Sequence, residues 1–387
     1  MRLLSELGRA LLDAGSMTWQ ITWSLILGFT LSAMVQAVVR RDAIARHLGD
    51  ENVQTLALAT GLGAASSSCS YAAVALARSI FQKGASFTSA MAFELASTNL
   101  VIELGIILTV LLGWQFTAAE FLGGILMVIF IGVIFRLTLT PKLVQMAKTQ
   151  AEKGLIGRME GHAAMDMSVS GGSLFSRLFS GRGFTAVSQF FVMDWASVWV
   201  DIVLGLLIAG ALAAWVPNSF WNAFFFSNNP TIAKIEGPLV GPLVSLVSFV
   251  CSVGNVPLAA VLWRGGISFG GVVSFIFADL IILPILDIYR KYYGWRVMGY
   301  ILLTFYIAMA AAGYLVEFLF QALGIIPTNR DVVAISEGVQ WNYTSVLNLL
   351  FLLLAAVLVI RFLRTGGLSM LRMMNTPAHE MSHHEIL

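Results

Sequence analysis

Long apolar runs, separated by short polar segments, make up most of the chain. A helix that crosses a membrane needs about 20 mostly apolar residues, and seven runs are long enough. Residues 1–16 instead carry charges between apolar positions at helical spacing, which predicts an amphipathic helix at the membrane surface. We predict membrane-spanning helices at Met17–Val39, Ser86–Leu112, Phe116–Leu139, Phe184–Val216, Ser268–Tyr289, Trp295–Leu323 and Ser345–Leu363.

Two further apolar runs, at about residues 56–81 and 239–263, are interrupted by residues that disrupt helices. Non-helical backbone at membrane depth is tolerated only inside the protein or beside a water-filled cavity. These runs therefore predict either broken spans or re-entrant hairpins near a pathway. The interrupting residues are Gly61, Gly63 and Ser66–Ser68 in the first run, and Gly241, Pro242, Gly254 and Pro257 in the second.

The two interrupted runs align with each other at an offset of 182 residues. Cys69–Phe87 lies over Cys251–Phe269, and when the alignment is continued to Ala96 and Ala278, ten of its 28 ungapped positions are identical, including a shared Cys-Ser pair. Each half of the chain then contains a span, an interrupted segment and two more spans. Paired interrupted segments of this kind are typical of transporter binding sites.

The positions of the basic residues distinguish between the two topologies. If both interrupted segments are hairpins, 18 Lys and Arg residues lie in the cytoplasm and five outside, whereas full crossings give 13 and ten. The positive-inside rule favours hairpins. We therefore predict an all-α polytopic membrane protein with two inverted repeats, each with a re-entrant hairpin. The predicted segments are repeats 17–139 and 184–323, a cytoplasmic linker 140–183, an extra transmembrane helix 345–364 and a cytoplasmic tail 365–387.

Composition agrees with a membrane protein. Hydrophobic residues make up 58% of the chain and charged residues 11%, with a net charge of +2 and a mean hydropathy of +0.83. So few charges cannot cover a soluble fold of this size. A soluble domain, a disordered chain and a nucleic-acid binder are therefore excluded, and we expect the lipid bilayer as the main partner. Gly-x-x-x-Gly spacings leave a homo-oligomer open.

The paired Cys-Ser motifs are the first candidate site. In the hairpin topology each pair begins the second arm, where a helix N-terminus favours anions and thiolates. Thiolates are ligands for soft metals and metalloids. The alternative is that these small residues only permit close helix packing, and that nearby Asn side chains bond between helices. The predicted substrate-binding residues are Cys69, Ser70, Cys251, Ser252, Asn255 and Asn99.

Acidic residues inside the predicted spans are the second candidate site. Charged groups in spans are costly and usually face the bundle interior or a water path. We predict a proton or ion path, with hydrogen-bonded structural acids as the alternative. The candidates are Glu94, Asp194, Asp201 and Asp279.

Histidine and methionine gather in the linker and the tail, and such residues lean toward copper-type ions. The tail even contains His-Glu-x-x-His, but it lacks a third ligand and a surrounding domain, so a metalloprotease is disfavoured. An unstructured linker and tail are the alternative. No nucleotide-binding or hydrolase motif occurs, so we expect neither an enzyme nor a cofactor. The weak metal candidates are His162, Met165, Met167, His379, His383 and His384.

The stretches Cys69–Ser97 and Cys251–Asp279 resemble the predicted-permease family that includes the ArsP organoarsenical efflux permeases. The resemblance runs from about His47 to Gly294 and implies a multi-spanning inner-membrane permease that exports trivalent organoarsenicals. The family's first motif, Pro-x-Cys-Ser-Cys-Gly, is altered here, because Ser67, Tyr71 and Ala72 stand at the proline, the second cysteine and the glycine.

Together these observations predict a secondary transporter in the bacterial inner membrane. It would export a soft metal(loid) or organoarsenical-type substrate by alternating access around the paired Cys-Ser tips. Two alternatives stay open. One is a channel-like permease for a small anion or organic solute, and the other is a metal-handling membrane subunit.

Overall fold

The computed structural model describes residues 2–38, 48–67, 70–82, 84–151, 174–178, 180–217, 220, 224–225, 229–248, 252–330 and 343–369. Its regular elements are helices, so the expected all-α class is confirmed. Four helical segments are long and apolar enough to cross a membrane, namely Phe87–Leu111, Trp114–Thr138, Trp295–Ala322 and Thr344–Arg364. A bent pair, Phe269–Leu280 and Leu283–Tyr293, is either a fifth span or a re-entrant loop, with a bend of 41°.

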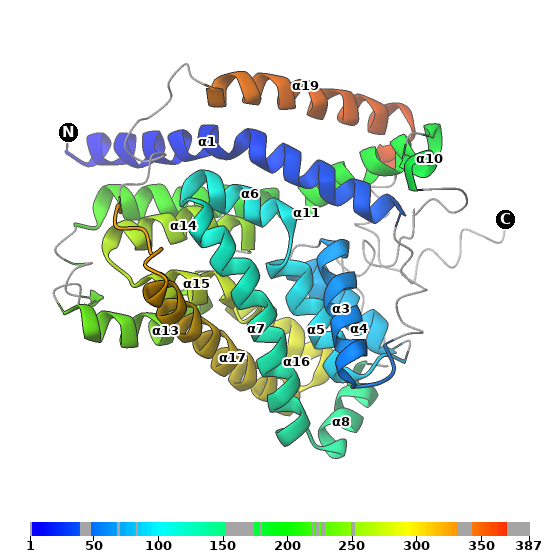
Figure 1. The fold of residues 1–387 in the computed structure, drawn as a ribbon. Helices are drawn as coiled ribbons and strands as arrows, with labels where there is room; N and C mark the ends of the chain where they lie inside the picture. Colours follow the sequence, from blue (N-terminus) through cyan, green and yellow to red (C-terminus); the bar gives the residue numbers. More distant parts are fainter. Residues whose placement is uncertain are drawn as a thin grey trace.

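Three long helices form one layer along the top of the molecule in Figure 1. They are α1 (Arg2–Val38), α11 (Gly181–Trp215) and α19 (Tyr343–Arg364), and α1 packs against both of the others. The Asn348 amide fastens α19 to α1 by bonds to the Trp23 N–H at 2.9 Å and the Trp19 carbonyl at 2.7 Å. The segments expected as an interfacial helix and a first span thus form one uninterrupted helix. In the described residues, α1 and α11 contain only shorter apolar stretches, Ile21–Leu31 and Ile202–Leu212.

The first half of the remaining bundle contains α3 (Val53–Ser66), α4 (Ser70–Gln82), α5 (Phe87–Asn99), α6 (Ile102–Leu111), α7 (Trp114–Thr138) and α8 (Pro141–Ala151). Both α3 and α4 pack against α5. The expected span Ser86–Leu112 is broken after Asn99, because Val101 is extended (φ −112°, ψ 143°) and starts a new helix.

The second half contains α13 (Pro230–Leu246), α14 (Ser252–Gly265), α15 (Phe269–Phe277), the 3₁₀ turn η1 (Ala278–Leu280), α16 (Leu283–Tyr293) and α17 (Trp295–Ala322). Both α13 and α14 pack against α15. A short helix, α10 (Leu174–Leu178), precedes α11.

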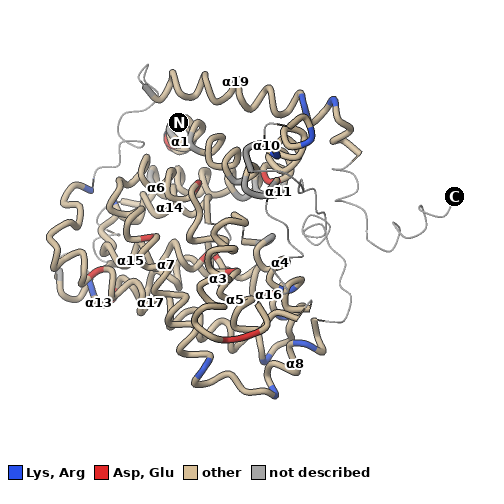
Figure 2. Tube along the Cα trace, turned by 45° about the vertical axis from the view of Figure 1, so that its right-hand side comes forward, with Lys and Arg blue, Asp and Glu red and all other residues tan. Residues whose placement is uncertain are grey.

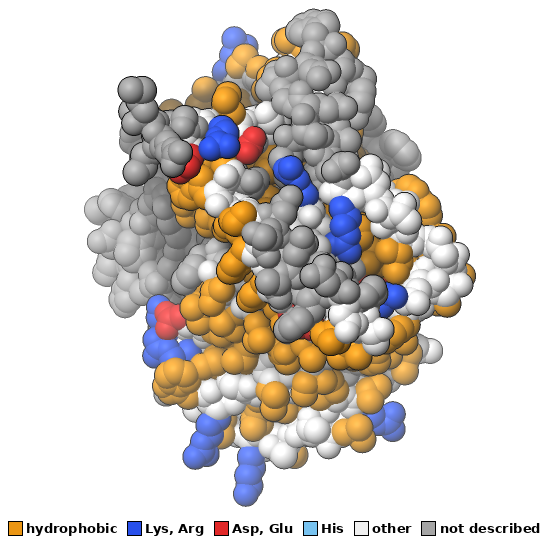
Figure 3. All heavy atoms as spheres, turned by 90° about the vertical axis from the view of Figure 1, so that its left-hand side faces the viewer, with side chains coloured by type: hydrophobic (Ala, Val, Ile, Leu, Met, Phe, Trp, Pro, Cys, Tyr) orange, Lys and Arg blue, Asp and Glu red, His pale blue; other side chains and the backbone are white. Residues whose placement is uncertain are grey.

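Apolar side chains cover the outside of the bundle. On α7 the exposed residues Ile125, Ile129 and Val133 repeat every four positions, while Gly124 and Met127 face inward. Figure 3 shows an apolar band across the lower half of one face, with Lys and Arg below it. Figure 2 shows basic residues around α8 and at the C-terminal end of α19. This pattern is that of a surface in contact with lipid.

Close packing of α3 on α5 depends on Gly63. A Cβ atom at Gly63 would lie 2.3 Å from the Phe93 carbonyl oxygen, whereas one at Gly61 would meet nothing within 4 Å. We expect Gly63→Ala to lower the free energy of unfolding by about 1–3 kcal/mol, the usual cost of overpacking. Gly61→Ala on the same helix should leave it unchanged or slightly raised. Thermal unfolding in detergent would check both, and equal melting temperatures for the two variants would contradict the packing argument.

Candidate functional site

The two Cys-Ser motifs meet at one buried carboxyl group. Ser70, the first residue of α4, donates a hydrogen bond from Oγ to Asp279 Oδ2 at 2.6 Å. The Ser252 side chain, at the start of α14, also hydrogen-bonds to the Asp279 carboxyl. All three residues are buried. The structure therefore joins three predicted site residues from three segments, while Cys69 and Cys251 lie outside the described residues.

The end of α3 is held by a second acid, Glu103. Ser67 has a left-handed backbone (φ 37°) and donates from its hydroxyl to the Glu103 carboxyl. A Cβ at Gly28 of α1 would overlap Glu103, so α1 lies directly against this residue. Glu103 thus ties α1, α3 and α6 together and is not joined to the Asp279 site.

The predicted asparagines bond locally. Asn255 donates from Nδ2 to Ser245 Oγ at 3.3 Å and accepts from Ser248 Oγ at 3.2 Å, which links α14 back to α13. Asn99 donates from Nδ2 to the Leu95 carbonyl at 3.1 Å and to Thr98 Oγ1 at 2.9 Å. Asn255 therefore holds the second interrupted segment together, and Asn99 closes the end of α5.

Two further acids lie next to Asp279. Glu94 of α5 accepts a hydrogen bond from the Tyr289 hydroxyl, and Asp279 acts electrostatically on Glu94. Asp279 also acts electrostatically on Glu120 of α7. Glu120 was not among the residues selected from the sequence, although it lies inside a predicted span. A complete survey of acidic residues within the spans would have found it.

The remaining predicted acids are on α11. Asp194 is buried there at 9% exposure. Asp201 belongs to the same helix, but its side chain lies outside what the structure describes. The structure therefore joins Glu94 with Asp279, and it does not bring Asp194 or Asp201 into the described contacts of that pair.

Several oxygens of this acid cluster have no hydrogen-bond partner among the described residues. They are Glu94 Oε2, both carboxyl oxygens of Glu120, Asp279 Oδ1 and the Tyr293 hydroxyl. No described Lys or Arg forms an ion pair with Glu94, Glu120 or Asp279. Ionised carboxylates without a cation are costly in a bilayer, so these groups are suited to hold protons or to receive a cation.

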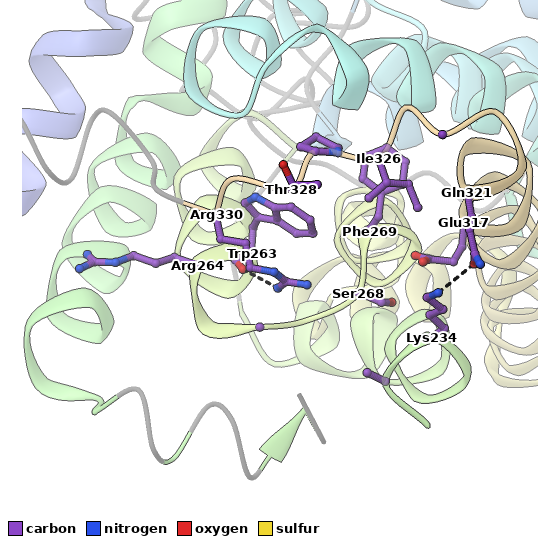
Figure 4. A pocket seen from close by; sticks show the side chains of 14 residues that line it. Lys234, Trp263, Arg264, Ser268, Phe269, Glu317, Gln321, Ile326, Thr328 and Arg330 are labelled. Carbon is purple, nitrogen blue, oxygen red and sulfur yellow. Dashed lines mark hydrogen bonds between the residues drawn. The ribbon is translucent and has the colours of Figure 1, made fainter. Parts of the chain in front are cut away.

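A cavity of about 560 Å³ opens at the end of the bundle formed by α13, α14, α15 and α17 (Figure 4). Arg330 donates from Nη1 to the carbonyls of Trp263 and Ile267, both at 2.9 Å, and lies 4.1 Å above the Trp263 ring. Across the cavity, Lys234 donates to Gln321 at 2.9 Å. Glu317 accepts from the Gly270 N–H at 2.5 Å, so the wall carries both charge signs.

Aromatic side chains close the bundle on both sides of the acids. We call Phe116, Trp263, Phe269 and Phe320 the pocket-side cluster. Its ring centroids are 5.1 Å apart for Phe116–Trp263, 4.7 Å for Phe116–Phe269 and 5.1 Å for Phe269–Phe320.

The linker-side cluster consists of Phe81, Phe87, Phe135 and Tyr293. Phe87 lies 5.3 Å from Phe81, 5.9 Å from Phe135 and 5.5 Å from Tyr293. Beside it, Arg78 lies 4.5 Å from the Tyr292 ring and donates to the Ala151 carbonyl at the end of α8. This cluster therefore borders the start of the linker.

The predicted metal residues cannot be placed. His162, Met165, Met167, His379, His383 and His384 all lie outside the described residues. Within the residues that are described, no group of three or more His, Cys, Asp or Glu side chains is arranged to hold a metal ion.

Comparisons with known proteins point to permeases. A protein named "Putative permease Rv2963" from Mycobacterium tuberculosis (strain ATCC 25618 / H37Rv) is 60% identical over 338 residues, which cover 87% of this chain and 83% of that protein. The "UPF0718 protein YraQ" of Escherichia coli (strain K12) is 26% identical over 210 residues, which cover 54% of each chain. No solved structure matches the chain.

The family model ArsP_1, described as a predicted permease, matches residues 6–318. The match includes both interrupted segments, the acid cluster and most of the cavity lining. It confirms the resemblance seen in the sequence and agrees with the membrane-spanning helices of the structure. The chain is therefore a multi-pass membrane protein that belongs to the ArsP_1 family of predicted permeases.

Proposed function

We propose that the chain is an inner-membrane secondary transporter that exports a soft metal(loid) or organoarsenical-type substrate. The observation that carries the proposal is the convergence of Ser70 and Ser252 on Asp279. Cys69 and Cys251 directly precede these serines in the chain. Each cysteine is therefore one residue along the chain from a serine that contacts the same carboxyl group. Two thiols in one neighbourhood suit a soft, thiol-binding cargo.

We propose further that the two halves, 17–139 and 184–323, are inverted repeats with re-entrant hairpins at about 56–81 and 239–263. Matched details support this. Ser86 and Ser268 both cap the next helix, and the glycines two residues earlier, Gly84 and Gly266, have φ values of 109° and 106°. The helix breaks at 100–101 and 281–282 also correspond, with a shift of one residue.

In this proposal the cargo binds between the halves and is released by alternating access. The cavity beside Trp263 and Arg330 is the opening on one side, and the linker-side cluster closes the other. The predicted positive-inside topology puts the linker in the cytoplasm, so the cavity faces outward. An outward cavity fits release of an exported cargo. Protons or the membrane potential supply the drive.

Removal of both thiols tests the cargo. We expect cells that express the chain to accumulate less of one species among methylarsenite, arsenite, antimonite and copper. Cells with Cys69→Ser/Cys251→Ser should accumulate as much as cells without the protein, because a hydroxyl does not replace a soft thiolate ligand. Metal content per cell, measured by mass spectrometry, is the readout.

Ser188→Ala is a matched control, since the hydrogen bond that this buried serine donates among the described residues stays within its own turn, to the Thr185 carbonyl at 2.8 Å. Cells with this variant should accumulate as little of the species as cells with the wild type. If cells with the double variant also accumulate as little, the proposal of a soft cargo is wrong. The site would then be better assigned to a small anion or organic solute, carried by a channel-like permease.

A further inference from the structure

The three acids Glu120, Asp279 and Glu94 follow one another between the two aromatic clusters. Helix α7 connects the clusters, because Phe116 near its start packs on Phe269 and Phe135 near its end packs on Phe87. Glu120 is six residues after the start of α7 at Trp114, or about 9 Å along the helix. Of these three acids, Glu120 is therefore the nearest to the cavity, whose own wall includes Glu317.

Glu94 lies toward the opposite end. Helix α5 begins at Phe87 in the linker-side cluster, and Glu94 is seven residues further, or about 10 Å along the helix. Asp279, in η1, acts electrostatically on both Glu120 and Glu94. The order from cavity to linker is thus Glu120, Asp279, Glu94.

Further side chains lie at both ends of this series of three acids. Phe116 is one turn before Glu120 on the same face of α7, and its ring contacts Trp263 and Phe269, which line the cavity. Phe116 therefore separates the cavity from Glu120. On the other side, Glu94 accepts a hydrogen bond from Tyr289. Glu94 and Arg78 both act electrostatically on the Tyr293 hydroxyl.

Among the groups around Glu120, Asp279 is the one that acts on it electrostatically. Helices α3 and α15 pack on α7 and carry no Asp, Glu, Lys, Arg, His or Tyr. The titratable groups on the other helices packed against α7 are Glu94 on α5, Glu103 on α6, and Arg296, Tyr300, Tyr306, Tyr314 and Glu317 on α17.

We infer that Glu120, Asp279 and Glu94 form a proton-carrying column and that Glu120 is its acceptor on the cavity side. The inference rests on the proposed transport function and names its coupling ion. Both oxygens of Glu120 are buried and have no partner among the described residues, so they are open to a proton that arrives from the cavity. A proton bound by Glu120, passed to Asp279 and released from Glu94 leaves every carboxyl as it started. Inward protons then exchange for outward cargo.

Reconstituted full-length protein in proteoliposomes tests the column, with methylarsenite as cargo. We expect Glu120→Gln to lose accumulation driven by a pH gradient and to keep downhill counterflow, because the cargo site at Asp279 is intact. Glu120→Asp should restore part of the gradient-driven accumulation. Glu6→Gln, at an exposed position on α1, should behave as the wild type. Full gradient-driven accumulation by Glu120→Gln, or drive by a sodium gradient in place of protons, would overturn the inference.

A second measurement does not depend on the cargo. The infrared spectrum of the wild type at neutral pH should show a protonated-carboxyl band that Glu120→Gln reduces. If methylarsenite counterflow is absent in the wild type but the band is lost in the variant, the cargo is wrong and the column stands. If the band is unchanged in the variant, Glu120 does not hold a proton and the column is wrong.

Discussion

The substitution Asp279→Asn is expected to abolish net transport. The amide has the size of the carboxyl but cannot gain or lose a proton, and it is neutral, so its hydrogen bonds with Ser70 and Ser252 are weaker than those of a charged carboxylate. Hydrogen bonds to charged groups contribute about 1.5–3 kcal/mol, so each one weakened would lower affinity for the cargo by roughly tenfold or more. Cargo flux into proteoliposomes and binding calorimetry would measure both effects.

Asp287→Asn is the matched control. Asp287 also lies in the second half, on α16, but it is partly exposed and pairs with Arg290 at 2.7 Å and with Lys291 at 2.8 Å. Exposed pairs contribute little, so flux should stay at the wild-type level. Normal flux in Asp279→Asn would show that the convergence of the two serines has no part in transport.

The substitution Arg330→Ala is expected to destabilise the packing of the segment that follows α17. The Arg330 guanidinium holds two backbone carbonyls and covers the Trp263 ring. Loss of a charged hydrogen-bond donor and of a cation–π contact costs about 2–4 kcal/mol together. We expect a lower melting temperature in detergent and faster proteolysis after residue 322.

Arg264→Ala provides the comparison, because this exposed arginine lines the same cavity and its side chain points away from Trp263 in Figure 4. Its melting temperature should match the wild type. If the two variants have the same melting temperature, the contacts of Arg330 with Trp263 do not stabilise the segment beyond the effect of a positive charge at the cavity.

The sequence predicts the helical class and most of the spans because apolar runs of about 20 residues are typical of transmembrane helices and rare elsewhere. Ser86–Leu112, Phe116–Leu139, Trp295–Leu323 and Ser345–Leu363 each correspond to a candidate span, and Ser268–Tyr289 corresponds to the bent pair. The break after Asn99 was not predicted. Its residues, Leu100 and Val101, are ordinary apolar residues, and a Cβ at Gly124 of α7 would lie 2.6 Å from the Leu100 side chain. That contact is tertiary, so no local pattern reports it.

The site was predicted in pieces. Ser70, Ser252 and Asp279 were separate candidates, one pair from the repeat and one acid from a span, and only the folded structure joins them. Glu120 was not predicted as a site residue, although it lies inside the predicted span Phe116–Leu139. Burial of an acid among apolar residues is itself the informative signal.

The pairing of α1 with α11 has a consequence for biosynthesis. Roughly 140 residues separate the end of α1 at Val38 from the start of α11 at Gly181. At about 5–20 residues per second, the ribosome needs roughly 7–30 seconds to deliver the partner. During that interval α1 lies in the insertion machinery or in lipid. Its face around Ala10 and Ala14, which later packs against Gly210 of α11, is then uncovered. Synthesis that stops before α11 therefore leaves this face of α1 uncovered and exposed to membrane proteases, even when α3–α8 are complete and α6 packs on another part of α1.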